Sequence, residues 1–597
     1  VQITGGSASI RFTGWRSVRW AAAAAREVLV AAAAESFAVP ASELTTDSGR
    51  VVHAASGRTA SYGSLAARAA ELELPAVPTF REAGARRYVG QRMPREDLPG
   101  KVFATTEYGI DVQLPGMVYA AVKHTPVIGA AVTAITNEAE ILARRGVASV
   151  HVVPEGVAVV ADNPWRAEQA ARAVTFTHEV LPQAEASTAS LVAEQRAAID
   201  PARDGELDVV LQRGEPLTGE AVTAEYLVPY LAHAGMEPLA AAVWRADGLV
   251  HVALGTQDPL GARAHVADRL DLSPDEVVVH PKVMGGGFGR RVGMAGGADG
   301  YNWLTETLEV FRATGLPVKL TWSREEDLRA GRYRPLTVAR LRGANGDDGL
   351  PRAWEGRFYG RAEEPEASVP ALYGIPNVDV RRADAEQFVP FAYWRSVEHS
   401  NHAFFVESFV DELARAAGRD PVDVRLGLLA RSDHPEARRA RGVLERAAEL
   451  AGWRGTPAGG RALGVALVAS FGSVVAQVAE VSLDGATPRV HRVWCAVDCG
   501  IAVNPDSVEA QIQGGVVFGL TAALYGKIDL ANGGVVQSNF HDYRMVRLAE
   551  SPRVTVSIVD SGGPIGGAGE VGVPPIAPAV ANALAALGTR RRELPLC

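Results

Sequence analysis

The sequence predicts a multidomain protein of mixed α+β and α/β class. The chain has 597 residues, which at roughly 150 residues per domain corresponds to three or four domains. Short segments in which apolar and polar residues alternate, typical of strands, are interspersed with longer apolar segments typical of helices. Hydrophobic residues make up 47% of the chain and charged residues 22%, which indicates a globular protein with a large core.

The charge and cysteine content exclude several classes of function. With 60 basic and 69 acidic residues, the chain has no excess of positive charge to bind nucleic acid. Cys495, Cys499 and Cys597 are too few for a disulfide framework, a zinc site or an iron–sulfur cluster. No apolar run reaches the roughly 18 residues of a transmembrane helix, and the start shows no signal-peptide pattern. Since the chain begins with Val1, we expect residues to be missing in front of it.

The first 84 residues are predicted to form a strand, two helices and a small β unit. Val1–Ile10 is predicted as a strand that ends in a Gly-Ser turn. The alanine-rich segment after it is predicted as a core helix over residues 15–37. Two short β segments follow at 39–45 and 49–53, then a second helix at 61–72 and a proline-rich linker at 74–80.

The next part of the chain is predicted to form an α+β module and then a larger α/β region. Strands are expected at 112–114, 117–122, 148–153 and 157–160, with a helix at 165–173. The polar stretch 183–214 is predicted as an exposed connection. The larger region, 215–430, includes strands at 250–254 and 277–283 and a helix at 403–417.

A glycine-rich linker at 451–460 precedes the last predicted region, which starts with a hairpin and ends in a strand, a turn and a helix. The strand is expected at 554–560 and the helix at 574–587, opened by prolines. Between them lies the stretch Ser561–Pro575, SGGPIGGAGEVGVPP. It places the carboxylate of Glu570 in a backbone so rich in glycine that a ligand can approach closely. Such a turn can also hold an anion on its free N–H groups.

Gly567, Gly569 and Gly572 satisfy the GxGxxG pattern of dinucleotide-binding proteins. Only 25 residues follow Gly572, and no further strand completes a mononucleotide unit. We therefore reject a Rossmann assignment, and an NAD-dependent dehydrogenase stays a third option that rests on this pattern alone. The patterns GxSxG, GxxxxGK[ST] and HExxH do not occur, so serine hydrolase, P-loop and zincin chemistry have little support.

Several further motifs are candidates for ligand binding, although each has a plain structural alternative. Gly285–Gly287, followed by Phe288 and Gly289, either lets a flat ligand pack on the main chain or forms an ordinary tight loop. Gln511 precedes the pair Gly514-Gly515, which also suits the start of a surface helix. The other candidates are Gln257 at a predicted strand end, Arg395 before a helix, and Ser7 and Ser9 in the Gly-Ser turn, where an N-cap explains the serines equally well.

Taken together and in order, these motifs resemble the molybdenum hydroxylases, the family of xanthine dehydrogenase and aldehyde oxidase. The resemblance is to the large, molybdopterin-binding subunit, of the isoquinoline 1-oxidoreductase type, and it covers nearly the whole chain. The resembling stretches are GGSAS (5–9), VGQRMPREDLPGKVFATTEYGIDVQLPGMVYAAV (89–122), YLAHAGMEPLAA (230–241), TQDP (256–259), VMGGGFGRR (283–291), NHAFFVESFVDELARAAGRDPVDVRL (401–426), VDCGIAVNPDSVEAQIQGG (497–515), SNFHDYR (538–544) and GGAGEVGVPPIAPAVANAL (566–584).

The resemblance implies a fold of three domains. An a/b hammerhead domain is expected at 85–182, a first molybdopterin-binding domain at 215–450 and a second one at 461–597, to which residues 1–84 contribute. It also implies that the dithiolene of molybdopterin holds the molybdenum, so no side chain serves as a metal ligand. This agrees with the lack of Cys and His ligand spacing in the sequence.

The resemblance assigns roles to the candidate residues. Glu570 is expected to be the catalytic base beside the molybdenum, and Gln257 to donate a hydrogen bond to an oxygen on the metal. The other cofactor-binding residues expected are Gly286, Gly287, Phe288, Gly289, Arg395, Gln511, Gly514, Gly515, Gly569, Ser7 and Ser9. A base of this kind typically contributes about 10² to 10⁴ in rate.

The implied activity is the hydroxylation of an isoquinoline-like N-heteroaromatic compound or an aldehyde, with water as the oxygen source. The cytosine dinucleotide form of molybdopterin is expected, with [2Fe–2S] clusters on a separate small subunit. Purine is disfavoured because Arg290-Arg291 stand where xanthine-oxidising relatives have Lys-Glu. The Met-Gly-Gln-Gly strand of isoquinoline-type subunits does not occur in this sequence, so either the sequence is a fragment or another polypeptide supplies the strand. A cofactor-free scaffold of the same fold is therefore the alternative, and location in the bacterial periplasm or cytoplasm stays open.

Overall fold

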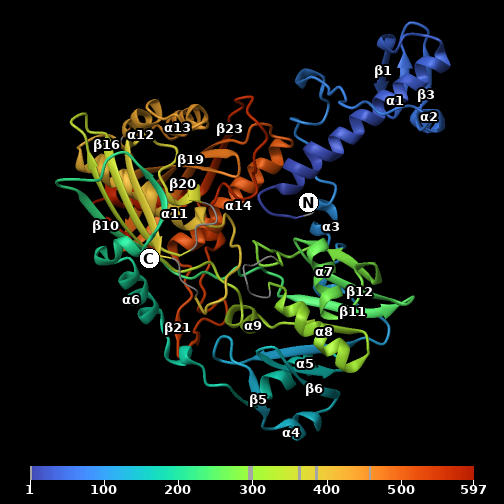
Figure 1. Ribbon diagram of the computed structural model, residues 1–597, viewed down its shortest axis with the longest axis horizontal. Coiled ribbons are helices and arrows are strands. Elements are labelled where there is room, and N and C mark those ends of the chain that lie inside the picture. The colour runs from blue at the N-terminus through green and yellow to red at the C-terminus, as the bar shows by residue number, and fades with distance from the viewer. Residues whose placement is uncertain (1–2, 294–299, 361–364, 384–386, 456, 458) are drawn as a thin grey trace.

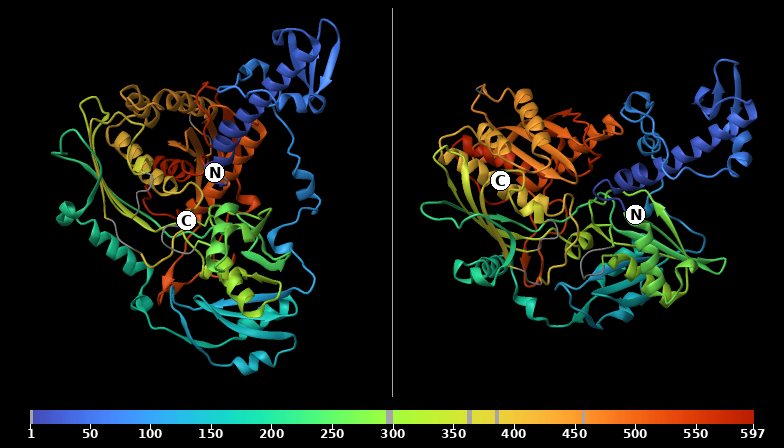
Figure 2. Two further views of the ribbon diagram at one scale, coloured as in Figure 1. Left: turned by 45° about the vertical axis from the view of Figure 1, so that its right-hand side comes forward. Right: turned by 45° about the horizontal axis from the view of Figure 1, so that its top comes forward.

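The computed structural model describes residues 3–293, 300–360, 365–383, 387–455, 457 and 459–597. The body of the protein is built around three mixed sheets, and a small N-terminal unit projects from it (Figures 1 and 2). Within the described ranges, no helix combines the length and apolar character needed to cross a bilayer.

The small unit consists of a three-stranded antiparallel sheet and two helices with a core of their own. Its elements are α1 (Arg19–Phe37), β1 (Leu44–Asp47), β2 (Arg50–His53), β3 (Arg58–Ser61) and α2 (Tyr62–Ala69). Ala32, Ala33 and Val51 are fully buried in this core. The alanine-rich helix and the β segment at 49–53 are therefore confirmed, whereas the segment predicted at 39–45 is mostly a 3-10 turn and its strand begins only at Leu44. The helix α1 connects this unit to the body.

The predicted strand at Val1–Ile10 is wrong for the residues that the structure describes. From Ile3 the chain turns through Gly6 and Ser7, with φ of +55° and +56°, and then forms a π-helix over Ser9–Val18 that leads directly into α1. A left-handed pair of residues breaks an extended strand. Val1 and Gln2 lie outside the described residues.

A seven-stranded sheet joins two segments that are far apart in the sequence. Its order is β13-β12-β11-β14-β4-β7-β6. The strands are β4 (Val118–His124), β6 (Val147–Val153), β7 (Gly156–Ala161), β11 (Ala240–Ala246), β12 (Leu249–Gly255), β13 (Val277–Lys282) and β14 (Val318–Thr321). The two segments are joined by the parallel pairing of β14 with β4. The segment predicted as a separate domain, 85–182, thus shares a sheet with the segment 215–450.

Helices cover this sheet on both faces. α7 (Pro259–Arg269) and α8 (Asn302–Thr314) pack on one face, and α5 (Pro164–Ala173) packs on the other, next to the small sheet of β5 (Val132–Ile135) and β8 (Phe176–His178). The predicted strand at 112–114 is wrong, because Pro115-Gly116 turns the chain and the Val112 carbonyl accepts a hydrogen bond from Lys319 Nζ (2.9 Å).

The other two sheets share one large core (Figure 1). The five-stranded sheet has the order β10-β15-β16-β17-β9 and the four-stranded sheet β18-β19-β20-β23. The strands are β9 (Asp208–Arg213), β10 (Val222–Val228), β15 (Thr337–Asn345), β16 (Pro351–Tyr359), β17 (Asn377–Ala383), β18 (Ala462–Ser470), β19 (Ser473–Asp484), β20 (Thr487–Asp498) and β23 (Arg553–Ile558).

The helix α11 (His399–Ala416) contacts strands of both of these sheets, and further helices of the described ranges pack in the same core. Among them are α12 (Pro421–Ala430), α13 (Ala437–Ala451), α14 (Pro505–Leu524) and α15 (Ile576–Ala586). The predicted hairpin, last strand and last helix are confirmed. The exposed connection predicted at 183–214 is wrong, since it contains β9 and α6 (Thr188–Ala198), whose Leu191 and Val192 are buried. Of the linker at 451–460, residues 456 and 458 lie outside the described residues.

A buried histidine ties β4 to the helices next to it. His124 Nε2 lies 2.8 Å from Glu306 Oε1 on α8, and His124 Nδ1 lies 2.6 Å from Glu326 Oε2 on α9 (Arg324–Arg329). Burial by itself lowers the pKa of His124, but the charges and hydrogen bonds of Glu306 and Glu326 outweigh burial and raise it to about 10. The imidazolium therefore links the seven-stranded sheet to α9.

Replacing His124 by Gln is expected to lower the midpoint of thermal unfolding by about 5 °C or more at pH 7, because two carboxylates lose their buried cation. Since the pKa is higher in the folded protein, His124 contributes its full stabilisation below about pH 6.5, and this contribution disappears as pH rises through 10. The difference between the two proteins in differential scanning calorimetry should therefore shrink toward pH 10. The exposed His541→Gln variant is the control; a pH-independent difference would contradict this assignment.

Candidate active site

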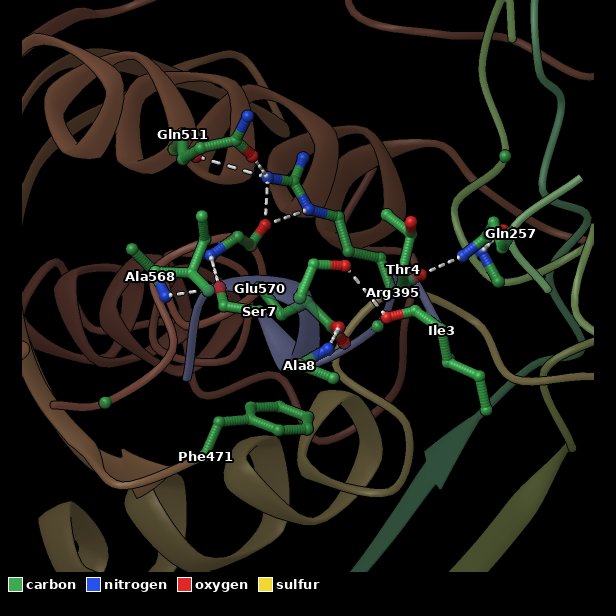
Figure 3. A pocket seen from close by; sticks show the side chains of 18 of the residues that line it. Ile3, Thr4, Ser7, Ala8, Gln257, Arg395, Phe471, Gln511, Ala568 and Glu570 are labelled. Carbon is green, nitrogen blue, oxygen red and sulfur yellow. Dashed lines mark hydrogen bonds between the residues drawn. The ribbon is translucent and has the colours of Figure 1, made fainter. Parts of the chain in front are cut away.

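A cavity of about 920 Å³ lies where the N-terminal segment, the edge of the seven-stranded sheet and the last region of the chain meet. Its walls come from residues 3–10, Gln257, the glycine loop after β13, residues 393–397 before α11, the first half of α14, and the turn between β23 and α15. Figure 3 shows Gln257 and Glu570 pointing into the same space from opposite sides. Segments hundreds of residues apart thus build one site.

Glu570 is held in place by main-chain groups. Its Oε2 accepts a hydrogen bond from the backbone N–H of Ser396 (2.8 Å), and its Oε1 accepts one from the N–H of Gly6 (2.5 Å). The hydroxyl of Ser396 donates to the carbonyl of Glu570 (2.7 Å). Both oxygens of the carboxylate are therefore oriented, and in the described ranges it forms no direct ion pair, although the charge of Arg395 acts on it. Such a group can accept a proton inside the cavity.

Ser396 was not among the residues predicted from the sequence. It has φ +79° and the next residue, Val397, has φ +48°, a region that is rarely adopted by residues other than glycine and is strained for a β-branched side chain. This backbone conformation points the N–H of Ser396 toward Glu570. Nothing in the sequence Trp-Arg-Ser-Val predicts this backbone, because it contains none of the residues that favour positive φ.

Gln257 lies at the end of β12 and presents the nitrogen of its amide to the cavity. The amide oxygen accepts hydrogen bonds from the backbone N–H of Gly289 (3.0 Å) and of Arg291 (3.4 Å). Nε2 is then free to donate into the cavity, where it meets the carbonyl of Thr4 (2.6 Å). Any oxygen of a ligand bound beside Gln257 competes with the Thr4 carbonyl for this donor.

The glycine loop fits closely against its neighbours. A Cβ atom on Gly287 would lie 2.6 Å from Gln257 Oε1, and a Cβ on Gly289 would lie 1.4 Å from the carbonyl oxygen of Tyr393. Gly289 also has φ +101°. Position 289 accepts only glycine, whereas a Cβ at position 287 would displace the end of the Gln257 side chain. Gly287 and Gly289 line the cavity, and Gly286 packs behind it against Gly235.

An aromatic stack forms one wall of the cavity. The ring of Phe288 stacks on Phe518 with centroids 4.5 Å apart and an angle of 27°, and Phe518 stacks on Trp394 at 4.7 Å and 28°. Phe288 and Trp394 line the cavity. The arrangement gives a flat apolar surface, against which a planar ring can stack.

Arg395 bridges α14 and the turn that carries Glu570 through hydrogen bonds to both. Its guanidinium donates to the carbonyl of Gly569 (2.9 Å) and to both oxygens of Gln511 (3.2 Å each). Burial lowers the pKa of Arg395 to about 10, although the charge of Glu570 opposes this. Gln511, Gly514 and Gly569 line the cavity. Gly515 does not, since its Cβ position faces the backbone of Gly572 at 3.2 Å.

The two serines of the N-terminal turn differ in their surroundings. The hydroxyl of Ser7 accepts hydrogen bonds from the N–H groups of Ala568 (3.0 Å) and Gly569 (3.3 Å), next to Glu570. Ser9 lines the cavity but is exposed, and it donates to the carbonyl of Ile3 (3.2 Å). The structure therefore brings together all the predicted site residues except Gly286 and Gly515, which support the cavity from behind.

The cavity is not a metal site built of side chains. No group of three or more His, Cys, Asp or Glu residues that could hold a metal ion occurs in the described ranges. The thiol of Cys499 lines the cavity, but burial raises its pKa to about 11, so it stays protonated at neutral pH. A metal in this cavity would need a ligand other than the protein.

Comparisons with known proteins point to one family. Two models described as "Molybdopterin cofactor-binding domain" match residues 212–427 and 456–552. Isoquinoline 1-oxidoreductase subunit beta of Brevundimonas diminuta is 32% identical over 97% of this chain and 81% of its own length. A membrane-bound aldehyde dehydrogenase (pyrroloquinoline-quinone) of Gluconacetobacter polyoxogenes is 26% identical over 100% of this chain and 83% of its length.

The fold is also that of a solved protein. Quinoline 2-oxidoreductase from Pseudomonas putida 86 superposes with a TM-score of 0.71 over 86% of this chain and 97% of the solved chain, at 16% identity. Such a low identity establishes the shared fold alone. The chain thus has the mixed α/β multidomain architecture expected from the sequence, with two molybdopterin-binding domains.

Proposed function

Because the chain belongs to the molybdenum hydroxylase family, as a large molybdopterin-binding subunit, we propose that it is a catalytic subunit that hydroxylates an N-heteroaromatic compound or an aldehyde. Water supplies the oxygen, and an iron–sulfur partner accepts the electrons. The observation that carries this proposal is that Gln257 and Glu570 line one cavity, next to a loop in which position 289 accepts only glycine.

The residues of the cavity fit molybdopterin. The volume of about 920 Å³ lies within the usual range for cofactor sites. Asn504 and Ser507, at the first turn of α14, line the cavity, and a helix N-terminus suits a phosphate. When bound, the cofactor supplies the redox chemistry and the dithiolene that holds the molybdenum. The family resemblance leads us to expect its cytosine dinucleotide form.

Glu570 and Gln257 act on the reacting groups from two sides. Glu570, with both oxygens oriented by N–H groups, takes up the proton of the oxygen nucleophile. Gln257 donates from Nε2, since its oxygen is already bonded to the loop. Arg395 keeps the Glu570 turn against α14, so the base keeps its position while substrates enter and leave.

The aromatic stack favours a planar substrate. Phe288 and Trp394 offer flat faces in the cavity, which suit an isoquinoline-like ring or an aromatic aldehyde. The names of the relatives point to the same two substrate classes. Arg290 and Arg291 do not line the cavity, so neither guanidinium contacts the substrate. Neither of these two positions carries an acid that could bind a purine.

We propose that the electrons leave this chain through a separate iron–sulfur subunit. The sequence has only three cysteines, which cannot hold the clusters that relay electrons. The relative from Brevundimonas diminuta is named a subunit beta. We therefore propose a heteromeric complex with a small [2Fe–2S] subunit.

The test is analysis of the intact complex, matured in a host that makes the cofactor. We expect about one molybdenum per chain, CMP released by acid hydrolysis, and oxidation of isoquinoline, quinoline, nicotinate or an aromatic aldehyde. A complex without molybdenum or pterin would refute the proposal. It would favour the second candidate, a cofactor-free scaffold, for which the bonds of Thr4 to Gln257 and of Gly6 to Glu570 are the supporting observation.

Replacing Arg395 by Lys is expected to lower the molybdopterin content of the purified complex about tenfold, because one ammonium group cannot bridge Gly569 and Gln511 as the guanidinium does. Fluorescence of the oxidised pterin measures the content. The control is Arg441→Lys, at an exposed arginine paired only with Glu445 on α13. Equal pterin content in the two variants would show that Arg395 does not support the cofactor site.

A further inference from the structure

Arg291 and Glu237 form a buried ion pair directly behind the glycine loop. Arg291 Nη2 lies 3.0 Å from Glu237 Oε2, and the two side chains are 1% and 5% exposed. Neither residue lines the cavity. Burial lowers the pKa of Arg291 and the charge of Glu237 opposes this shift, so the guanidinium keeps its charge. A pair so deeply buried costs desolvation energy and calls for a specific role.

Three glycines from different parts of the chain make room for this pair. A Cβ on Gly285 would lie 2.5 Å from Glu237 Cβ, a Cβ on Gly255 would lie 2.8 Å from Arg291 Nη1, and a Cβ on Gly109 would lie 3.3 Å from Glu237 Oε1. Larger residues at these positions would displace one member of the pair. The surroundings are therefore shaped around it.

Every polar atom of the pair holds the main chain near the loop. The guanidinium of Arg291 donates to the carbonyls of Gly286 (3.0 Å), Gly255 (3.3 Å) and Glu237 (2.9 Å). The carboxylate of Glu237 accepts from the N–H groups of Gly285 (2.8 Å) and Ile110 (3.0 Å). The first two glycines of the loop are thus bonded to the pair from behind.

The same loop fixes the amide of Gln257 from the other side. Gly289 and Arg291 donate their N–H groups to Gln257 Oε1, and Gln257 donates its backbone N–H to the carbonyl of Arg291 (2.9 Å). If the loop moves, Gln257 Oε1 loses its donors and the amide can rotate. The orientation of the Nε2 donor in the cavity then depends on the pair.

We propose that Glu237 and Arg291 are positioning residues, which lock the glycine loop and thereby keep the Nε2 of Gln257 aimed at the reacting group. The proposal rests on the function proposed above for Gln257. The charged side chain of Arg291 thus supports the glycine loop on the side away from the cavity and does not bind the substrate. The motif MEP at 236–238 supplies the partner of this charge.

The test compares Arg291→Lys with Arg290→Lys in the intact complex. Arg290 is a matched control: it is also buried, but it bonds to the Gly300 carbonyl and Asn302 and packs on Trp303. In Arg291→Lys the charge stays and the bonds to Gly286 and Gly255 are lost. We expect amide hydrogen exchange of residues 284–291 to become about tenfold faster, with no such change in Arg290→Lys. Glu237→Gln removes the negative charge and leaves only one oxygen to accept from the N–H groups of Gly285 and Ile110. It should give the same acceleration and replaces Arg291→Lys if that variant does not fold.

A second measurement asks whether the pair acts through Gln257. Per molybdenum bound, Arg291→Lys should lower kcat about tenfold with little change in KM, and it should have almost no further effect when Gln257 is already Ala. The proposal would be overturned if amide hydrogen exchange of residues 284–291 were unchanged in Arg291→Lys. It would also be overturned if Arg291→Lys lowered kcat by the same factor with and without Gln257→Ala. If the wild-type complex holds no molybdenum, the proposed function fails, while the exchange experiment still decides whether the pair locks the loop.

Discussion

Replacing Glu570 by Gln is expected to lower turnover by about 10² to 10⁴ while the complex keeps its cofactor, because the amide cannot take up a proton. The amide oxygen can still accept a hydrogen bond from Ser396 or Gly6, and the hydroxyl of Ser396 still donates to the carbonyl of residue 570. The turn should therefore keep its shape. The loss should fall on kcat measured per molybdenum, by steady-state kinetics with the best substrate found.

The control for this variant is Glu445→Gln, on the exposed face of α13, where the carboxylate is paired only with Arg441 (2.9 Å). Its activity should match that of the wild type. Activity of Glu570→Gln within a few-fold of the wild type would remove Glu570 from the role of base. Loss of molybdenum from this variant would instead mean that Glu570 holds the cofactor site together.

Replacing Gly289 by Ala is expected to abolish activity and to leave the complex with little or no molybdopterin. The new Cβ would lie 1.4 Å from the carbonyl oxygen of Tyr393, and φ is +101°, so both the contact and the backbone exclude a side chain. The loop must move, and Gln257 then loses the N–H of Gly289 as a donor to its Oε1. Metal analysis and pterin fluorescence of the purified complex measure the outcome.

Gly442→Ala is the matched control, because this glycine lies within α13 and a Cβ there would meet no atom within 4 Å. It should keep full cofactor content and gain slightly in stability, by about 1 kcal/mol or less. A Gly289→Ala complex with normal molybdenum content would show that the close contact with Tyr393 can be relieved without disturbing the cavity.

Local patterns in the sequence predicted the parts of the site that depend on neighbouring residues. Glu570 lies on a turn between a strand and a helix, as its glycines and the prolines after it indicated. Gln257 lies two residues beyond the end of β12, close to the place that the alternation before it indicated. The glycine loop follows β13. Each of these predictions needed only the periodicity of one strand or helix.

The features that the sequence did not predict depend on residues far apart in the chain. Ser396 contacts Glu570 only because residues 396 and 397 adopt a strained backbone, which tertiary contacts impose. Arg291 was interpreted through substrate recognition, yet it turns away from the cavity to Glu237. The pairing of β14 with β4 joins strands about 200 residues apart. The Gly-Ser turn at residues 5–9 was predicted, but the strand expected there does not form from Ile3 on, and a π-helix follows the turn instead.

Crystals of the intact complex, with diffraction recorded at both sides of the molybdenum K absorption edge, test the central claim most directly. Our account predicts an anomalous difference peak in the cavity, between the Nε2 of Gln257 and the carboxylate of Glu570, with Thr4 displaced from Gln257. A molybdenum-containing complex whose peak lies away from these two side chains would contradict it.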